Sequence, residues 1–287
     1  MQDPKFIDVG GIQTRYFEAG QGEPVVLVHG GQFGWFNCAT DWDLNFDDLA
    51  RDFHVFALDR IGQGHSDNPR DPSEYLLGTA SQHLYDFIKA VGLTQAHLVG
   101  HSRGGYGVTR VALEHPEVVK SLVIVDSGSL MHQSAPFYDE LDKKAAHITD
   151  TREMIEFKMV NSSFSGDIMS QGWVDDIMTF IETPKHRIAQ ETNAETKTVS
   201  RADHIQRQSE SQEAIRNGAL KNFPVLVIWA YDDQSASMEE CGIPAMHLIL
   251  PNVPNSRMHV FNQAGHYVFR EHPKEFNAIV RTFLNGL

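Results

Sequence analysis

The chain has 287 residues, enough for a large buried core, and 41% of them are hydrophobic, as in an ordinary globular protein. Asp and Glu total 38 against 24 Lys and Arg, and the resulting net charge of −14 argues against nucleic acid or an anionic membrane as a partner. Two cysteines cannot build a disulfide framework, and we see neither a signal segment nor an apolar run of the ~18 residues that span a bilayer. We therefore expect a cytoplasmic protein without disulfides.

The first half of the chain alternates strand-like and helix-like stretches. Residues 6–9 and 12–18 alternate polar and apolar side chains on either side of Gly10-Gly11, which predicts a β-hairpin. Four later stretches are apolar throughout, as strands buried on both faces are, and helical spacing follows the first three of them. These four stretches are residues 24–28, 54–58, 96–99 and 121–125.

This alternation predicts an α/β fold, a mostly parallel sheet with helices on both faces. From about residue 130 to 217 the strand pattern stops, and the segment is polar and helical with many apolar side chains. We expect it to form a helical lid (130–217) over the carboxyl edge of a core made of residues 1–129 and 218–287. The sheet pattern resumes with strands at 223–230 and 257–261 and a closing amphipathic helix at 272–284.

The most informative motif is Gly100-His-Ser-Arg-Gly104, which lies between a predicted strand and a predicted helix. Gly-x-Ser-x-Gly in that setting is the nucleophile elbow, a tight turn that holds the serine in a strained conformation above the sheet. We expect both glycines to be required, because a Cβ at either position would collide with the neighbouring strand or helix. The motif predicts Ser102 as a nucleophile.

A serine hydroxyl needs a neutral imidazole to take its proton and a carboxylate to orient that imidazole. Asp233 and His266 follow later strands and complete the order Ser, Asp, His that this kind of sheet uses. Asp126 and Asp232 are rival acids, and we prefer Asp233 because it lies one residue further into its turn than Asp232 does. His29 and His101 also lie near strand ends, where we expect supporting hydrogen bonds and packing.

The developing oxyanion needs preorganised N–H donors. The backbone N–H of Arg103 at the start of the elbow helix is one, and the N–H of Gly31 in the loop after residue 28 is the second. We expect the Arg103 side chain to lie at the surface or in a salt bridge. The sequence contains no His, Cys or carboxylate pattern with metal-ligand spacing, and we expect no metal and no cofactor.

Several motifs together carry a resemblance to a known family: His29-Gly30-Gly31, Asp59-x-x-Gly62-x-Gly64-x-Ser66, Gly100-x-Ser102-x-Gly104-Gly105, Trp229-x-x-x-Asp233 and Gly265-His266. Over nearly its full length the chain resembles the α/β-hydrolase fold family. Within it, the closing run from Met258 through His266 to His272 is most similar to the meta-cleavage-product hydrolases. That resemblance implies cofactor-free hydrolysis of a C–C bond in ring-opened aromatic dienoates.

The chain departs from that subfamily at three places. Its first loop reads His29-Gly-Gly-Gln-Phe-Gly34 where the subfamily usually has His-Gly-x-Gly-Pro-Gly, and Arg103 replaces the common methionine. The matching position of the subfamily's substrate-binding lid arginine holds Ile177, with Arg187 nearby but out of register. Candidate substrate contacts are Phe33, Tyr267 and Arg187.

We therefore expect a serine-dependent hydrolase of a small, largely apolar carbonyl compound, nearest to the C–C hydrolases. A carboxylesterase or lactonase would use the same triad and is the alternative within enzymes. A binding protein that retains the fold without catalysis is a second class, and the complete triad argues against it. The expected partner is a small-molecule substrate, and a homodimer is an assembly that the sequence permits.

Overall fold

The computed structural model describes residues 1, 3–131, 137–166 and 168–287. Its centre is an eight-stranded sheet with the strands β1 (Lys5–Val9), β2 (Ile12–Ala19), β3 (Pro24–Val28), β4 (His54–Leu58), β5 (Ala96–His101), β6 (Val119–Val125), β7 (Val225–Ala230) and β8 (Ser256–Phe261). The spatial order is β1-β2-β4-β3-β5-β6-β7-β8. Only β2 runs against its neighbours, β1 and β4, and the remaining pairs are parallel. The predicted hairpin and mostly parallel sheet are confirmed.

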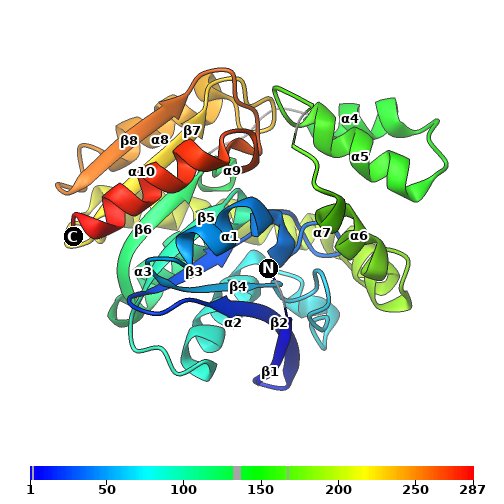
Figure 1. The fold of residues 1–287 in the computed structure, drawn as a ribbon, viewed down its shortest axis with the longest axis horizontal. Helices are drawn as coiled ribbons and strands as arrows, with labels where there is room; N and C mark the ends of the chain where they lie inside the picture. Colours follow the sequence, from blue (N-terminus) through cyan, green and yellow to red (C-terminus); the bar gives the residue numbers. More distant parts are fainter. Residues whose placement is uncertain (2, 132–136, 167) are drawn as a thin grey trace.

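Helices cover both faces of this sheet (Figure 1). One face carries α1 (Asp43–Leu49), α9 (Val268–Glu271) and α10 (Pro273–Asn285), and the other carries α2 (Leu77–Ala90), α3 (Arg103–Glu114) and α8 (Ile243–Ile249). On the first face, Trp42, Phe269 and Phe276 pack together. On the second face, Leu84 and Phe87 of α2 are buried against the sheet, as the helical spacing of its apolar residues predicts. Short turns complete the core: η1 (Ala39–Trp42), η2 (Pro72–Glu74), η3 (Pro116–Val118), η4 (Gly128–Leu130) and the π-helical η5 (Met238–Gly242).

Between β6 and β7 the described residues form four α-helices, which we call the inserted segment: α4 (Phe137–Ala145), α5 (Thr151–Asn161), α6 (Gln171–Phe180) and α7 (Pro184–Arg216). They gather at one side of the molecule in Figure 1. Trp173, Ile177 and Phe180 of α6 are buried in the same apolar cluster as α1 and α10, so the inserted segment packs directly on the core.

Buried ion pairs reinforce this packing. Arg15 of β2 bonds Asp59 at 2.6 Å and also Asp176 of α6 at 2.7 Å. Arg270 of α9 stacks on the Trp173 ring at 3.7 Å and bonds Asp43 at 2.6 Å. The inserted segment is therefore anchored to the core by charge as well as by apolar contact.

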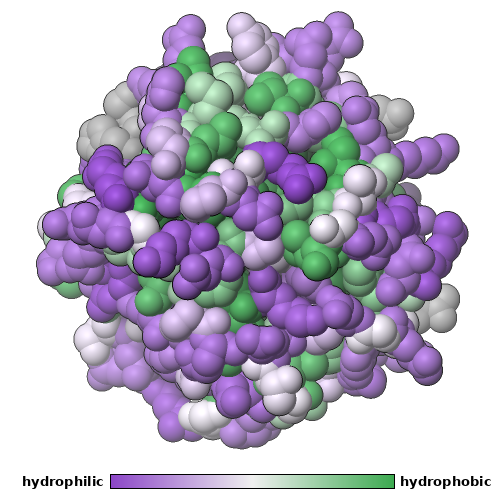
Figure 2. All heavy atoms as spheres, turned by 90° about the vertical axis from the view of Figure 1, so that its left-hand side faces the viewer, coloured by the Kyte–Doolittle hydropathy of each residue, from purple (hydrophilic) through white to green (hydrophobic). Residues whose placement is uncertain are grey.

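The outer surface is largely polar on the side that carries the C-terminus. Figure 2 shows hydrophilic residues over most of this side, with apolar residues in separate patches. Among the helices that the structure describes, none combines the length and the apolar character that crossing a membrane requires, although α7 has 33 residues.

Candidate active site

Ser102 lies at the sharp turn between β5 and α3, with φ 53° and ψ −119°, a conformation that residues with a side chain rarely adopt. Its amide donates to the carbonyl of Val125 at 2.8 Å, which ties the turn to β6. A Cβ on Gly100 would collide with the backbone of Gly104, and a Cβ on Gly104 would collide with the carbonyl of Val28. Close packing of α3 on the sheet therefore explains why the motif needs glycine at both positions.

His266 and Asp233 form a buried pair beside this turn. Nδ1 of His266 donates to Oδ2 of Asp233 at 2.6 Å, and the other carboxylate oxygen accepts from the amides of Ser235 (2.7 Å) and Ala236 (2.9 Å). The carboxylate is thus fixed in place, and Nε2 of His266 is left as the atom that can take a proton from Ser102. Nε2 of His101, the residue before the serine, donates to the His266 carbonyl at 2.7 Å and holds the two loops together.

The two rival acids have other partners. Oδ1 of Asp126 accepts from the amide of Ala230 at 2.7 Å, and Oδ2 of Asp232 accepts from the amide of Gln263 at 3.0 Å. Burial, together with the charge of Asp233, raises the pKa of Asp126 well above its usual range. Of the three aspartates, Asp233 is the one that bonds His266.

Two free amides lie beside the nucleophile. Within the described residues, neither the amide of Gly31 nor that of Arg103 donates a backbone hydrogen bond. The Gly30 backbone approaches so closely that a Cβ there would lie 2.9 Å from the Ser102 Cβ, and Gly31 adopts φ 74°. These amides are the available donors for an oxyanion that forms at a carbonyl attacked by Ser102.

His29 supports this loop without taking part in proton transfer. Its Nε2 accepts from the amide of Arg60 at 3.0 Å, so its Nδ1 carries the hydrogen and donates to the Gly30 carbonyl at 2.9 Å. Burial lowers the pKa of His29 to about 3, and burial also lowers that of His101 well below its usual range. Both rings stay neutral, as expected of groups that position the site rather than react in it.

The three predicted substrate contacts lie in different environments. Tyr267 is buried beside the site, with its ring 5.8 Å from that of His266 and its hydroxyl accepting from Asn37 at 3.3 Å. Phe33 is buried against Tyr75, 4.9 Å between ring centroids, in a separate small cluster. Arg187 is exposed on α7. The assignment of these residues to the substrate pocket stays a prediction.

The Arg103 side chain is partly exposed, and no ion pair or hydrogen bond to its guanidinium is formed by the residues that the structure describes. The salt bridge that was one of the two expected alternatives is therefore not found. Sequence reasoning also missed Trp35 and Tyr138, whose rings meet edge to face at 4.8 Å, and Arg60. Arg60 directly follows Asp59 at a strand end, which is the signal that could have drawn attention to it.

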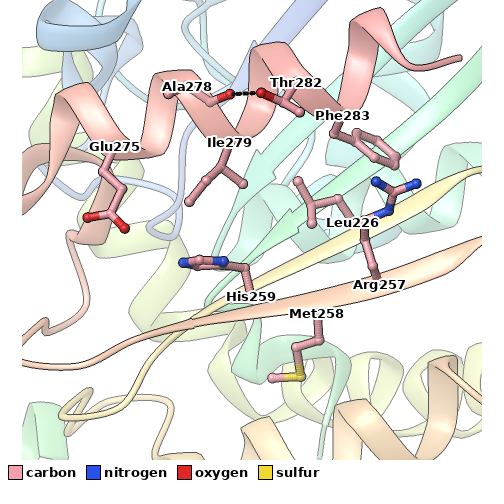
Figure 3. Close-up of a pocket in the computed structure, with 9 residues that line it drawn as sticks. All are labelled: Leu226, Arg257, Met258, His259, Glu275, Ala278, Ile279, Thr282 and Phe283. Atoms are coloured by element: carbon pink, nitrogen blue, oxygen red, sulfur yellow. Dashed lines mark hydrogen bonds between the residues drawn. The ribbon is translucent and has the colours of Figure 1, made fainter.

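A hollow lies between α10 and β8 (Figure 3). Its cavity volume is about 310 Å³, and Ile279 of α10 points toward Leu226 and His259 across it. Its lining contains none of the triad or oxyanion residues, so this hollow is separate from the active site. In the described ranges, no three His, Cys, Asp or Glu residues gather as a metal site would require.

Comparison with known proteins places this geometry in a family. A model of the alpha/beta hydrolase fold matches residues 23–153. A 2-hydroxy-6-oxononadienedioate/2-hydroxy-6-oxononatrienedioate hydrolase from Burkholderia vietnamiensis is 30% identical over 296 residues, which cover 95% of this chain and 91% of that protein. The chain belongs to the α/β-hydrolase fold family, and it is a hydrolase.

Two more relatives narrow the similarity. A 2-hydroxy-6-oxo-6-(2'-aminophenyl)hexa-2,4-dienoic acid hydrolase from Metapseudomonas resinovorans is 28% identical over 288 residues, 98% of this chain and 90% of that protein. A solved serine hydrolase involved in carbazole degradation superposes with a TM-score of 0.77 at 26% identity and 99% coverage of both chains. The predicted similarity to meta-cleavage-product hydrolases is thereby confirmed.

Proposed function

We propose that this hydrolase cleaves the C–C bond next to the ketone of a ring-opened aromatic 2-hydroxy-6-oxo-dienoate. The observation that carries the proposal is the buried His266–Asp233 pair beside Ser102, in a chain whose relatives over almost their whole length are named for such substrates. These relatives favour C–C cleavage over the carboxylesterase or lactonase alternative.

The site residues divide the reaction between them. Ser102 attacks the C6 ketone, or orients a water that does, while Nε2 of His266 takes the proton and Asp233 stabilises the resulting imidazolium. The amides of Gly31 and Arg103 hold the oxyanion. The electron pair of the breaking C5–C6 bond needs an acceptor, which the 2-oxo tautomer provides once a proton has moved to C5. Water then releases the acyl group, with His266 as its base.

We also propose that the inserted segment is the lid of the active site. Trp173 of α6 lies 5.7 Å from the Tyr267 ring, and Tyr138 of α4 meets Trp35 of the core, so apolar rings from both parts face one another near the triad. Such walls suit an apolar dienoate and exclude bulk water, which strengthens the interactions of the oxyanion with its donors.

The test follows the yellow colour of 2-hydroxy-6-oxo-6-phenylhexa-2,4-dienoate, with p-nitrophenyl butyrate as the ester substrate. We expect the wild-type protein to bleach the dienoate and Ser102→Ala to lose several orders of magnitude in kcat. Robust ester hydrolysis without loss of dienoate colour would overturn the proposal in favour of an esterase. Bleaching that survives Ser102→Ala would overturn the assigned nucleophile.

A further inference from the structure

Two arginines lie near Ser102, beyond the triad and the oxyanion amides. Arg103 is the residue after the nucleophile, at the first position of α3. Arg60 is 5% exposed, and its Nη1 donates to the carbonyls of Gly31 at 2.9 Å and Gly30 at 3.2 Å. The Arg60 cation therefore binds the same peptide unit that supplies the Gly31 N–H as an oxyanion donor.

These two arginines differ from the other buried arginines of the core in their partners. Arg15 and Arg270 each bond a carboxylate at 2.6 Å. No carboxylate among the described residues pairs with Arg60 or Arg103, and the groups that accept from Arg60 are two carbonyls and the Gln63 amide oxygen. Burial and the nearby charge of Arg103 lower the pKa of Arg60 to about 9. A buried cation without a counter-charge is costly, and a bound anion would remove that cost.

The Arg103 side chain lies between the core and the inserted segment. Burial lowers its pKa, and the neighbouring Tyr138 of α4 opposes that shift. Arg103 in turn contributes to lowering the pKa of His204 on α7, a ring whose Nε2 donates to the Ser129 carbonyl at 2.8 Å. The guanidinium therefore has neighbours from both α4 and α7 of the inserted segment.

We propose that Arg103, with Arg60 beside it, binds a carboxylate of the substrate. The inference rests on the proposed function, because a dienoate carries a carboxylate at the opposite end of the conjugated chain from the ketone that Ser102 attacks. A guanidinium binds a carboxylate through two parallel hydrogen bonds, which fixes the position of the chain as well as its charge. Arg103 thus acts twice: its amide holds the oxyanion, and its side chain selects an anionic substrate.

The experiment measures binding in the Ser102→Ala background, so that the ligand is not consumed. The probes are 2-hydroxy-6-oxo-6-phenylhexa-2,4-dienoate and its methyl ester, titrated calorimetrically at pH 7. We expect Arg103→Met, which retains the backbone amide, to raise the Kd of the acid by about 30-fold, the size of effect that loss of one partner from a buried charge pair produces. The Kd of the methyl ester should change far less. Arg201→Met, an exposed arginine on α7, is the matched control and should leave both Kd values unchanged.

Several outcomes would overturn the inference. Equal losses of affinity for the acid and the ester would mean that Arg103 only shapes the cavity. If Arg187→Met weakens binding of the acid and Arg103→Met does not, the residue that binds the carboxylate lies in the inserted segment. If Arg103→Met does not fold, Arg103→Lys keeps the charge without the paired hydrogen bonds, and an unchanged ratio of acid to ester affinity in that variant would equally contradict the proposal.

The experiments can overturn the proposed C–C reaction and the proposed carboxylate-binding site independently of each other. Arg103-dependent binding of the acid without bleaching by the wild-type protein would overturn the C–C reaction and leave the anion site standing. Bleaching together with acid binding that does not depend on Arg103 would overturn the anion site alone.

Discussion

Asp126 and Asp233 follow neighbouring strands of the sheet, and their hydrogen bonds differ. Asp233 accepts from two backbone amides and from His266. Asp126 accepts from one amide, and no partner reaches its buried Oδ2 from the described residues. One carboxylate is therefore fixed in place beside His266, while the other supports the end of β7.

Replacement by asparagine separates these two roles. Asp233→Asn should lower kcat for the dienoate by as much as about 10⁴-fold, because an amide no longer fixes the imidazole tautomer. Asp126→Asn should keep kcat within about tenfold, since asparagine has the same shape and its amide oxygen still accepts from the amide of Ala230. Initial rates of colour loss for the two variants measure this difference. If Asp126→Asn lowered kcat more than Asp233→Asn did, Asp126 and not Asp233 would be the acid of the triad.

The sequence pattern identified candidate residues that directly follow predicted strands. It did not predict the surroundings of a side chain whose neighbours come from a distant segment of the chain. Ser102, Asp233 and His266 stand at turns that a local pattern identifies. The unpaired state of Arg103 depends on α4 and α7, which lie far away in the chain. No local pattern shows that the cation after the serine has Tyr138 as a neighbour and forms no ion pair with a carboxylate of the described residues.

At the scale of elements, the inserted segment is joined directly to the loop that carries His266. The amide of His266 donates to the Ser162 carbonyl at the end of α5, at 2.8 Å. Glu271 of α9 accepts from the Gly265 amide at 2.7 Å and from the amides of Phe164 (2.9 Å) and Ser165 (3.0 Å). One side chain thus fixes the histidine loop and the α5–α6 connection together.

We therefore expect Glu271→Gln to disturb catalysis from outside the triad. A glutamine offers one acceptor oxygen where three amides need two, so kcat should fall by about tenfold and the melting temperature by several degrees, as expected for one or two lost hydrogen bonds to a charged group. Steady-state kinetics and thermal unfolding measure both effects. Glu275→Gln, on the exposed side of α10, is the control. An unchanged kcat in Glu271→Gln would show that the histidine loop needs no such support.

Elements that are buried on both faces were easier to predict from the sequence than elements that are half-exposed. Strands covered on both faces are continuous apolar runs, and β3 to β7 were identifiable for that reason. The helices of the inserted segment are half-exposed and share their apolar side chains with the core, so their borders follow tertiary contacts. The sequence pattern did not predict that α7 has 33 residues or that Trp173 is buried against Arg270.

For the whole molecule, four buried histidines affect how stability depends on pH. Burial lowers the pKa of His29 to about 3, of His83 and His186 to about 4, and that of His101 well below its usual range. In the unfolded chain a histidine takes up a proton below about pH 6.5. Between that value and the folded pKa, the unfolded state binds more protons, so stability falls as the pH falls.

His83 allows this linkage to be measured at one residue. It is 5% exposed and its Nε2 lies 2.9 Å from the Thr14 hydroxyl. Between pH 7 and pH 5 the wild-type free energy of unfolding should decrease by about 2 kcal/mol more than that of His83→Gln. Urea unfolding at the two pH values gives the difference, with the exposed His247→Gln as the control. Parallel losses in wild type and His83→Gln would mean that His83 is already protonated in the folded protein.

The inserted segment leaves the core after β6 and returns before β7, two strands that are parallel neighbours in the sheet. A connection between such strands must cross the sheet in any case, so lengthening it disturbs no strand pairing and adds little entropy cost to folding. The core with its triad and the segment above it can therefore diverge at different rates. Evolution can change the substrate range by remodelling this one crossover, provided that the contacts of Arg15 and Arg270 with it are kept.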